Sequence, residues 1–128
     1  MNAPQTRFEQ ANPILRVEDM ARAVRYYVDV LGFEQASWGD DHFGCVSRGG
    51  ASIYLARGEQ GHTGSWVWIG VSDAEAVHAE IAARGARIRH GPTNYSWALE
   101  VRVEDPDGNV LRMGSDPKTD RPYQPWKP

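Results

Sequence analysis

The chain repeats one plan twice, and this repetition limits the folds that it can adopt. NPILRVEDMARAVRYYVDVLGFE and SWVWIGVSDAEAVHAEIAARGAR each contain a strand-like apolar run, an aspartate, a helix-like run and a glycine. Asp19 and Asp73 suit helix N-caps, because a carboxylate oxygen there accepts hydrogen bonds from free backbone N–H groups. Gly32 and Gly85 follow them by 13 and 12 positions, where left-handed C-caps are expected. The repetition predicts two similar units.

Strand-like sequence follows each of the two predicted helices. The segments EQASW, HFGCVSR and ASIYLAR follow the first helix, and RIRHG, ALEVRVE and VLRMG follow the second, with turn sequences such as DPDGN between strands. Each unit is therefore β-α-β-β-β, at about 11–57 and 65–115, which is an α+β arrangement. We expect one domain over residues 1–115. The tail 116–128 holds four of the eight prolines, so we expect no regular structure there and a path over a surface or a partner.

The predicted strands have two chemically different faces, because successive side chains of a strand point to opposite sides. The face toward the helices is apolar: Leu15, Val17, Val46, Ile53, Leu55, Val67, Ile69, Val71, Leu99, Val101, Val103, Leu111 and Met113. The opposite face mixes rings with charges of both signs: Asn12, Arg16, Phe43, Cys45, Tyr54, Trp66, Trp68, Glu100, Arg102 and Arg112. Ligand sites combine apolar walls with a few polar groups, so we infer a surface for a ligand or a partner. A dimer interface or a second core layer is the alternative explanation for the alternate tryptophans.

Composition narrows the classes of function. A net charge of −3 argues against a nucleic-acid partner, because phosphate contacts need concentrated Lys and Arg. No apolar run approaches the length of about 18 residues that spans a membrane, and the N-terminal residues contain no apolar targeting segment. The single cysteine, Cys45, excludes an internal disulfide and fits a reducing compartment. We therefore expect a cytoplasmic protein with neither a membrane nor a nucleic acid as partner.

RVEDMARAVRYYVDVLGFE and VEDPDGNVLRM, together with the paired β-α-β-β-β plan, resemble the vicinal oxygen chelate superfamily. This superfamily includes glyoxalase I, extradiol dioxygenases, fosfomycin-resistance enzymes and bleomycin-resistance proteins, and the resemblance runs from about residue 11 to 115. It implies paired modules that form a cup-shaped mixed sheet, usually within a homodimer. WVWIGV followed by an acid-led helix is most similar to the bleomycin-resistance proteins, as is Trp97, eight positions before Asp105 of the turn.

The resemblance to the bleomycin-resistance proteins implies an aromatic clamp made of Trp38, Phe43, Trp66 and Trp97. Stacking a planar ligand between such rings contributes roughly 0.5–1.5 kcal/mol per ring beyond the buried area. Those proteins are strongly acidic, whereas this chain carries arginines on the same face, so a smaller planar or anionic molecule would fit it better than bleomycin. Tyr54, Trp68, Arg16, Glu100, Arg102 and Arg112 complete the expected ligand-binding set.

The catalytic members of the superfamily hold a divalent metal with His, Gln and Glu side chains, and the corresponding positions here hold Asn12, Trp66 and Arg112. An indole offers no lone pair, and a guanidinium is a permanent cation that repels a metal ion. His42, His62, His78 and His90 show no spacing typical of a local metal site. We therefore expect no cofactor and no catalytic residue, in a homodimeric protein that sequesters a planar or aromatic ligand, such as a bleomycin-family antibiotic. The alternatives are a lyase, isomerase or dioxygenase that uses Zn, Ni, Mn or Fe, and a scaffold whose aromatic face serves only dimerisation.

Overall fold

The computed structural model describes residues 5–128 and contains eight strands, two α-helices and one π-helical turn within that range. In chain order these are β1 (Ile14–Arg16), α1 (Met20–Arg25), η1 (Tyr26–Val30), β2 (Glu34–Gln35), β3 (Phe43–Arg48), β4 (Ala51–Ala56), β5 (Trp66–Gly70), α2 (Ala74–Ala83), β6 (Arg87–Asn94), β7 (Leu99–Glu104) and β8 (Val110–Ser115). The order confirms an α+β fold made of two β-α-β-β-β units. No helix in the described range is long and apolar enough to cross a membrane.

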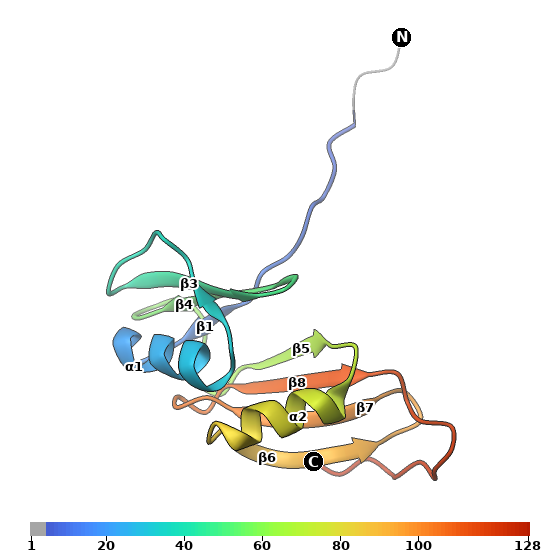
Figure 1. The fold of residues 1–128 in the computed structure, drawn as a ribbon. Coiled ribbons are helices and arrows are strands. Elements are labelled where there is room, and N and C mark those ends of the chain that lie inside the picture. The colour runs from blue at the N-terminus through green and yellow to red at the C-terminus, as the bar shows by residue number, and fades with distance from the viewer. Residues whose placement is uncertain (1–4) are drawn as a thin grey trace.

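The strands form two four-stranded mixed sheets, one from each unit (Figure 1). Their strand orders are β1-β4-β3-β2 and β5-β8-β7-β6, so the two sheets have the same topology. In each sheet the first strand of the unit pairs in parallel with the last, and the other neighbours are antiparallel. A helix precedes the last three strands of each unit, which gives the first strand the crossover that a parallel neighbour requires.

Both helical segments, α1 with η1 and α2, begin after the predicted aspartate caps and end before the predicted glycines. The side chains of Asp19 and Asp73 accept hydrogen bonds from the backbone N–H groups three residues further on. Gly32 and Gly85 have positive φ values of 77° and 89°, which a residue without Cβ adopts readily after a helix. The first helix differs from the expectation in one respect, because its second half is the π-helical turn η1.

The helix-facing residues of both sheets form one apolar core. Leu15, Val46 and Leu55 of the first sheet are at most 1% exposed, and so are Val101 and Leu111 of the second. The same cluster includes side chains of α1, η1 and α2. The two units are therefore packed against each other through their helix sides, and Figure 1 shows α1 and α2 each lying against its own sheet.

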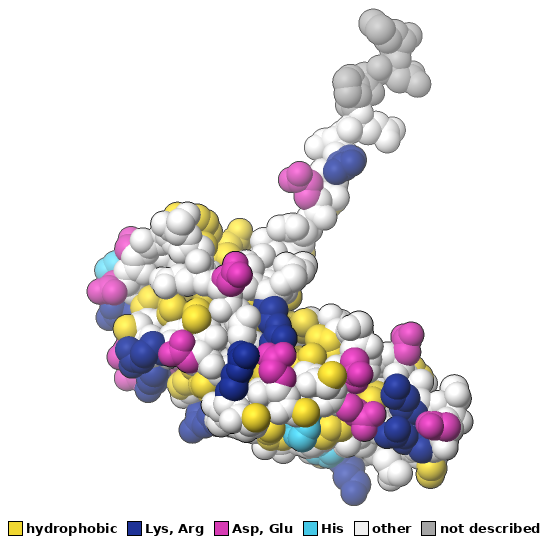
Figure 2. Space-filling model, in the orientation of Figure 1, with side chains coloured by type: hydrophobic (Ala, Val, Ile, Leu, Met, Phe, Trp, Pro, Cys, Tyr) yellow, Lys and Arg dark blue, Asp and Glu magenta, His cyan; other side chains and the backbone are white. Residues whose placement is uncertain are grey.

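Polar contacts also join the two units. The hydroxyl of Tyr27 donates to Oδ2 of Asp105 over 2.9 Å inside the core. Burial raises the pKa of Tyr27 well above its usual value, and the nearby Asp105 carboxylate raises it further. Closer to the surface, the Arg48 guanidinium forms a two-pronged ion pair with Glu80 of α2. Figure 2 shows basic and acidic side chains next to each other on this face of the molecule.

The segments outside the two sheets differ from each other. Residues 5–11 extend away from both sheets (Figure 1). The tail 116–128 has no helix or strand, as its prolines predict, and it turns back onto the second sheet.

Two strands differ in length from the others of their sheets. Strand β2 is only two residues long, whereas β6 is eight residues long and continues through two register shifts beyond the expected RIRHG.

Candidate ligand-binding face

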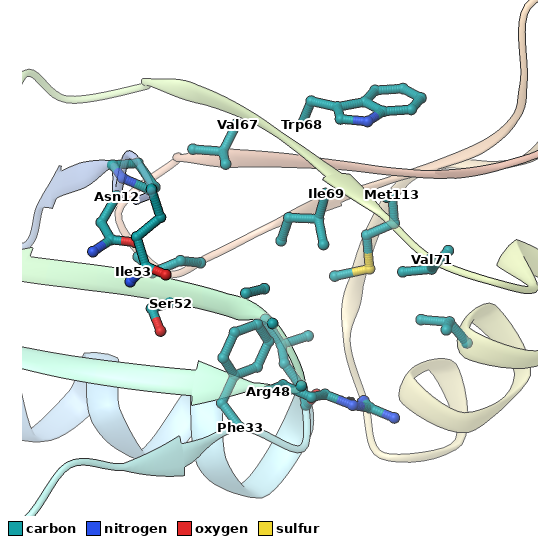
Figure 3. Close-up of a pocket in the computed structure, with 18 of the residues that line it drawn as sticks. Asn12, Phe33, Arg48, Ser52, Ile53, Val67, Trp68, Ile69, Val71 and Met113 are labelled. Atoms are coloured by element: carbon teal, nitrogen blue, oxygen red, sulfur yellow. Dashed lines mark hydrogen bonds between the residues drawn. The ribbon is translucent and has the colours of Figure 1, made fainter. Parts of the chain in front are cut away.

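The two tryptophans of β5 lie on the face opposite the core. Figure 3 shows Trp68 pointing to one side of the strand while Val67 and Ile69 point to the other. Trp66 and Trp68 are 45% and 49% exposed, whereas most residues of β7 and β8 in the same sheet are buried. The alternation predicted from SWVWIGV is therefore present, and the outer face of the second sheet carries large rings.

Trp68 lies against a bare stretch of the neighbouring strand β8. A Cβ atom built on Gly114 would collide with the six-membered ring of this tryptophan. The guanidinium of Arg112, one step along the same face, is 5.4 Å from the Trp68 ring centroid. The missing side chain at Gly114 thus allows the indole to lie flat on the sheet beside a cation.

Glu100 is the hub of a buried polar group on this face. Its side chain is 1% exposed and accepts two hydrogen bonds from Arg112, of 3.0 and 2.9 Å. This pairing raises the pKa of Arg112 above its usual value. The indole N–H of Trp97 donates to the same carboxylate. Glu100 therefore fixes the direction of one arginine and one tryptophan.

The C-terminal tail brings a further tryptophan onto this face. The ring of Trp126 is 4.1 Å from the Arg102 guanidinium and 5.0 Å from that of Arg112, measured to its centroid. It also lies 5.7 Å from Tyr95 and 6.1 Å from Trp97, whose own rings stack in parallel at 4.6 Å. Rings and guanidinium groups thus alternate across the second sheet, an arrangement that cation–π attraction stabilises.

The first sheet carries a separate ring cluster, made of Trp38, Phe43 and Tyr54. Their centroids lie 5.3–6.2 Å apart, with Trp38 and Phe43 nearly parallel. Asn12 donates a 3.3 Å hydrogen bond to the Tyr54 hydroxyl. Trp38 is 52% exposed, so this cluster is also open to solvent.

The structure does not assemble the expected clamp within one chain. Trp38 and Phe43 lie on the outer face of the first sheet, whereas Trp66 and Trp97 lie on that of the second. No aromatic contact joins the two groups among residues 5–128. The physical reason is the shared core, because two sheets that pack through their helix sides turn their outer faces apart.

All four of the expected polar ligand residues have partners within the chain, and Arg112 has its partner in Glu100. Glu100 and Arg102 are each 1% exposed, since the rings and the tail cover them, so neither is directly open to solvent. Arg16 donates to the carbonyl of Gln60 over 3.3 Å and belongs to neither ring cluster. The alternation of a strand predicts which face carries a charged residue. It does not predict that segments distant in the sequence, such as the tail, cover that residue.

Sequence reasoning missed three members of this face: Tyr95, Arg89 and Trp126. Tyr95 precedes Trp97 by two positions. Its ring is 1% exposed and stacks against the half-exposed ring of Trp97. Arg89 lies 5.2 Å from the Trp66 ring and pairs with Glu104. Trp126 could have been identified from the sequence, because a large aromatic residue in a proline-rich tail suggests that the tail packs against the rest of the protein.

A cleft of about 610 Å³, lined by both apolar and polar residues, lies along β5 between the two units. Figure 3 shows Val67, Ile69 and Met113 directed toward Phe33 and Ile53 across this space, with Arg48 at one end. Val67, Ile69 and Val71 are consequently only partly buried, which the sequence pattern did not anticipate. The ring of Trp68 points away from Val67 and Ile69, but Trp68 is also among the residues that line the cleft, so the cleft adjoins the ring-lined face at β5.

The residues at the superfamily's metal positions do not fit a metal ion. Asn12 uses its amide to bind Tyr54, Trp66 lies between two guanidinium groups, and Arg112 is paired with Glu100. Within residues 5–128, no group of three or more His, Cys, Asp or Glu side chains is arranged to hold a metal. Of these three residues only Asn12 has an oxygen that could bind a cation, because an indole and a guanidinium cannot coordinate one.

The paired units, their mixed sheets and the ring-lined outer faces define a class of protein, and the sequence comparison agrees. The model of the Glyoxalase/Bleomycin resistance protein/Dioxygenase superfamily matches residues 7–113, and the chain belongs to this superfamily. The chain has no significant sequence match among curated proteins.

Solved structures give more particular similarities. The bleomycin-binding protein of bleomycin-producing Streptomyces verticillus, in complex with copper(II)-bleomycin, is 30% identical, with a TM-score of 0.75 over 87% of this chain and 98% of that one. TnmS3, an antibiotic binding protein from Streptomyces sp. CB03234, is 23% identical, with a TM-score of 0.71 over 88% and 99% of the two chains. TioX from Micromonospora sp. ML1 is also 23% identical, with a TM-score of 0.71 over 84% and 99%. The last two similarities concern the fold alone.

Proposed function

We propose that this chain is a metal-free binding protein that sequesters a planar or aromatic small molecule against the ring-lined face of its second sheet. The observation that carries the proposal is the exposure of Trp66, Trp68 and Trp97, each nearly half accessible and each oriented by a neighbouring charged residue. Exposed rings held in fixed directions have the form of a stacking site. The 30% identity to a bleomycin-binding protein supports the same class of function and makes a bleomycin-family antibiotic one candidate ligand.

We further propose that two chains form the complete site. In a homodimer, the Trp38–Phe43–Tyr54 cluster of one chain would face the Trp66–Trp97 group of its partner, which restores the clamp that a single chain lacks. Capture would then be stoichiometric and would take place in the cytoplasm. Sedimentation equilibrium tests the assembly, and a strictly monomeric protein that still binds ligand would contradict it.

Tryptophan substitution tests the binding function. Trp66→Ala and Trp97→Ala should each weaken the binding of bleomycin, or of the planar molecule that binds best in a panel, by about tenfold. Calorimetry gives the affinity, and far-UV circular dichroism verifies the fold. Phe8→Ala is the matched control, because Phe8 is 99% exposed and lies outside both sheets.

Metal content measured on the same sample separates this function from a metal-dependent lyase or dioxygenase. About one Zn, Ni, Mn or Fe per chain would overturn the proposal. Tryptophan fluorescence that no member of the panel changes would favour a face that serves only dimerisation.

A further inference from the structure

The end of the tail contacts the ring-lined face with the kinds of group that a bound ligand would use. Trp126 places a planar ring between Arg102 and Arg112, next to Trp97. The following residue, Lys127, places its carbonyl oxygen 2.9 Å from a guanidinium nitrogen of Arg102. Together these groups present a flat aromatic surface and a hydrogen-bond acceptor to the second sheet.

One buried charge on this face, that of Arg102, has no ion-pair partner among the described residues. Arg112 is paired with Glu100, and Arg89 is paired with Glu104. Arg102 is 1% exposed and, within residues 5–128, forms no ion pair. Its Nε is buried without a hydrogen-bond partner, and its other partners are two neutral oxygens, of Tyr95 and Lys127. A buried guanidinium without a carboxylate is costly, because removing a charge from water needs compensation by an opposite charge.

The attachment of the tail divides it into a fixed and a releasable part. Asn94 is 5% exposed and binds both the N–H and the carbonyl of Lys118, over 2.8 and 2.9 Å. The N–H of Gln124 donates to the carbonyl of Asn94 over 2.7 Å. Beyond Gln124, the hydrogen bonds and ring contacts that join the described tail to the second sheet are those of the Trp126 ring and the one bond that Arg102 donates to the Lys127 carbonyl. Residues 125–128 can therefore leave the sheet while Asn94 retains the rest.

From these observations we infer that the second sheet binds planar aromatic anions in exchange for residues 125–128 of the tail. The aromatic part of the ligand takes the place of the Trp126 ring, and its anionic group takes the place of the Lys127 carbonyl on Arg102. The exchange is favourable because a carboxylate supplies the counter-charge that a neutral carbonyl does not. This inference rests on the proposed binding function and adds to it the charge of the ligand and the identity of the segment that the ligand displaces.

A matched pair of small molecules tests the inference on the full chain. The probes are 2-naphthoate and 2-naphthamide, which share one planar ring system and differ in charge. Indole N–H signals in ¹⁵N NMR spectra report Trp126 directly, and calorimetry gives the affinities. We expect naphthoate to bind at least tenfold more tightly than naphthamide and to move the Trp126 signal to the position of a solvent-exposed indole.

Three variants locate the effect. Trp126→Ala should bind naphthoate at least threefold more tightly than the parent chain, because a docked tail reduces the fraction of chains that can accept a ligand. Arg102→Gln should reduce the affinity for naphthoate to that for naphthamide. Arg25→Gln is the matched control, because Arg25 is an exposed arginine at the end of α1 and lies outside both sheets, so removing its charge should leave the preference for naphthoate unchanged.

The outcomes separate this inference from the function on which it rests. Equal affinities for the two probes, or a bound naphthoate that leaves the Trp126 signal unchanged, overturn the exchange while the binding function stands. Weaker binding by Trp126→Ala would also overturn it, by showing that the tail is a wall of the site. If Trp126→Ala, with its face uncovered, binds neither the naphthalene probes, nor bleomycin, nor any planar molecule of the panel, the proposed binding function fails and the inference fails with it.

Discussion

Gly114 is the residue that allows Trp68 to lie flat on the second sheet, and the closeness of this contact gives a test. Gly114→Ala introduces a methyl group where the indole ring now lies, and overpacking of this kind costs typically 1–3 kcal/mol. Because Trp68 is half exposed and can swing outward, we expect a loss of about 1 kcal/mol in the free energy of unfolding, with red-shifted tryptophan emission. Chemical denaturation measures the first effect.

The Trp68→Leu background provides the control for this substitution. Without the indole, alanine at position 114 should be neutral or slightly stabilising, since glycine weakens the interior of a strand. An equal loss in both backgrounds would show that the contact between Trp68 and Gly114 is not the cause.

At the scale of residues, the sequence predicts the face of the strand on which a side chain lies, but not which distant segments cover that side chain. Alternation alone places Trp66 and Trp68 on the outer face, because a strand has a period of two. It does not reveal that Arg102 is covered by Trp126, since the two are 24 positions apart and meet only through the path of the tail. Contacts between distant segments depend on packing that no local pattern encodes.

At the scale of elements, the DPDGN turn is tied to the helical segment of the other unit. Asp105 accepts hydrogen bonds from the backbone and side chain of Asn109 as well as from the Tyr27 hydroxyl. Tyr27→Phe removes one donor from a buried carboxylate, which should lower the free energy of unfolding by about 1–3 kcal/mol. Denaturant titration measures the change. Tyr123→Phe is the control and should have no effect, because Tyr123 is 49% exposed.

The ion pair between Arg48 and α2 gives a pH-dependent contribution to stability. The hydrogen bond from Arg48 lowers the pKa of Glu80 below its usual value of 4.5. A lowered folded-state pKa stabilises the protein above about pH 4.5, and this contribution is lost as the pH falls through the folded-state pKa. Because both side chains are more than a third exposed, Glu80→Gln should cost only about 0.5 kcal/mol at pH 7.

Thermal or urea unfolding of Glu80→Gln and the parent chain at several pH values measures this contribution. The difference in stability should shrink as the pH falls below 4.5 and through the lowered folded-state pKa of Glu80, because the carboxyl group then becomes protonated in both states. A difference that is the same at pH 7 and pH 3 would show that the ion pair is not its source.

Elements were the level that sequence reasoning predicted best. The caps at Asp19 and Asp73 and the glycines after each helix fix the helix limits locally, so their positions are confirmed. The π-helical turn η1 was not predicted, because apolar spacing at Met20, Val24 and Tyr27 does not distinguish it from a continued α-helix. The extension of β6 was missed for a similar reason, since its register shifts and Pro92 obscure the strand pattern.

At the scale of the whole molecule, two units that share one core should unfold together. Side chains of both sheets and all three helical segments form a single cluster, so neither unit can open without exposing apolar surface of the other. We expect buried amides of β4 and β7 to exchange hydrogen with the same free energy of opening. Native-state hydrogen exchange measures both, and a first sheet that opens at a clearly lower free energy than the second would contradict a shared cooperative core.

The parallel rings of Tyr95 and Trp97, with Trp126 beside them, also have an optical consequence. Aromatic chromophores held this close couple their electronic transitions, and a fixed tilt such as the 44° between Trp97 and Trp126 makes the coupling optically active. The chain therefore carries its own exciton signal in circular dichroism. Departure of the tail would reduce that signal, so release of the tail from the second sheet can be followed in unlabelled protein.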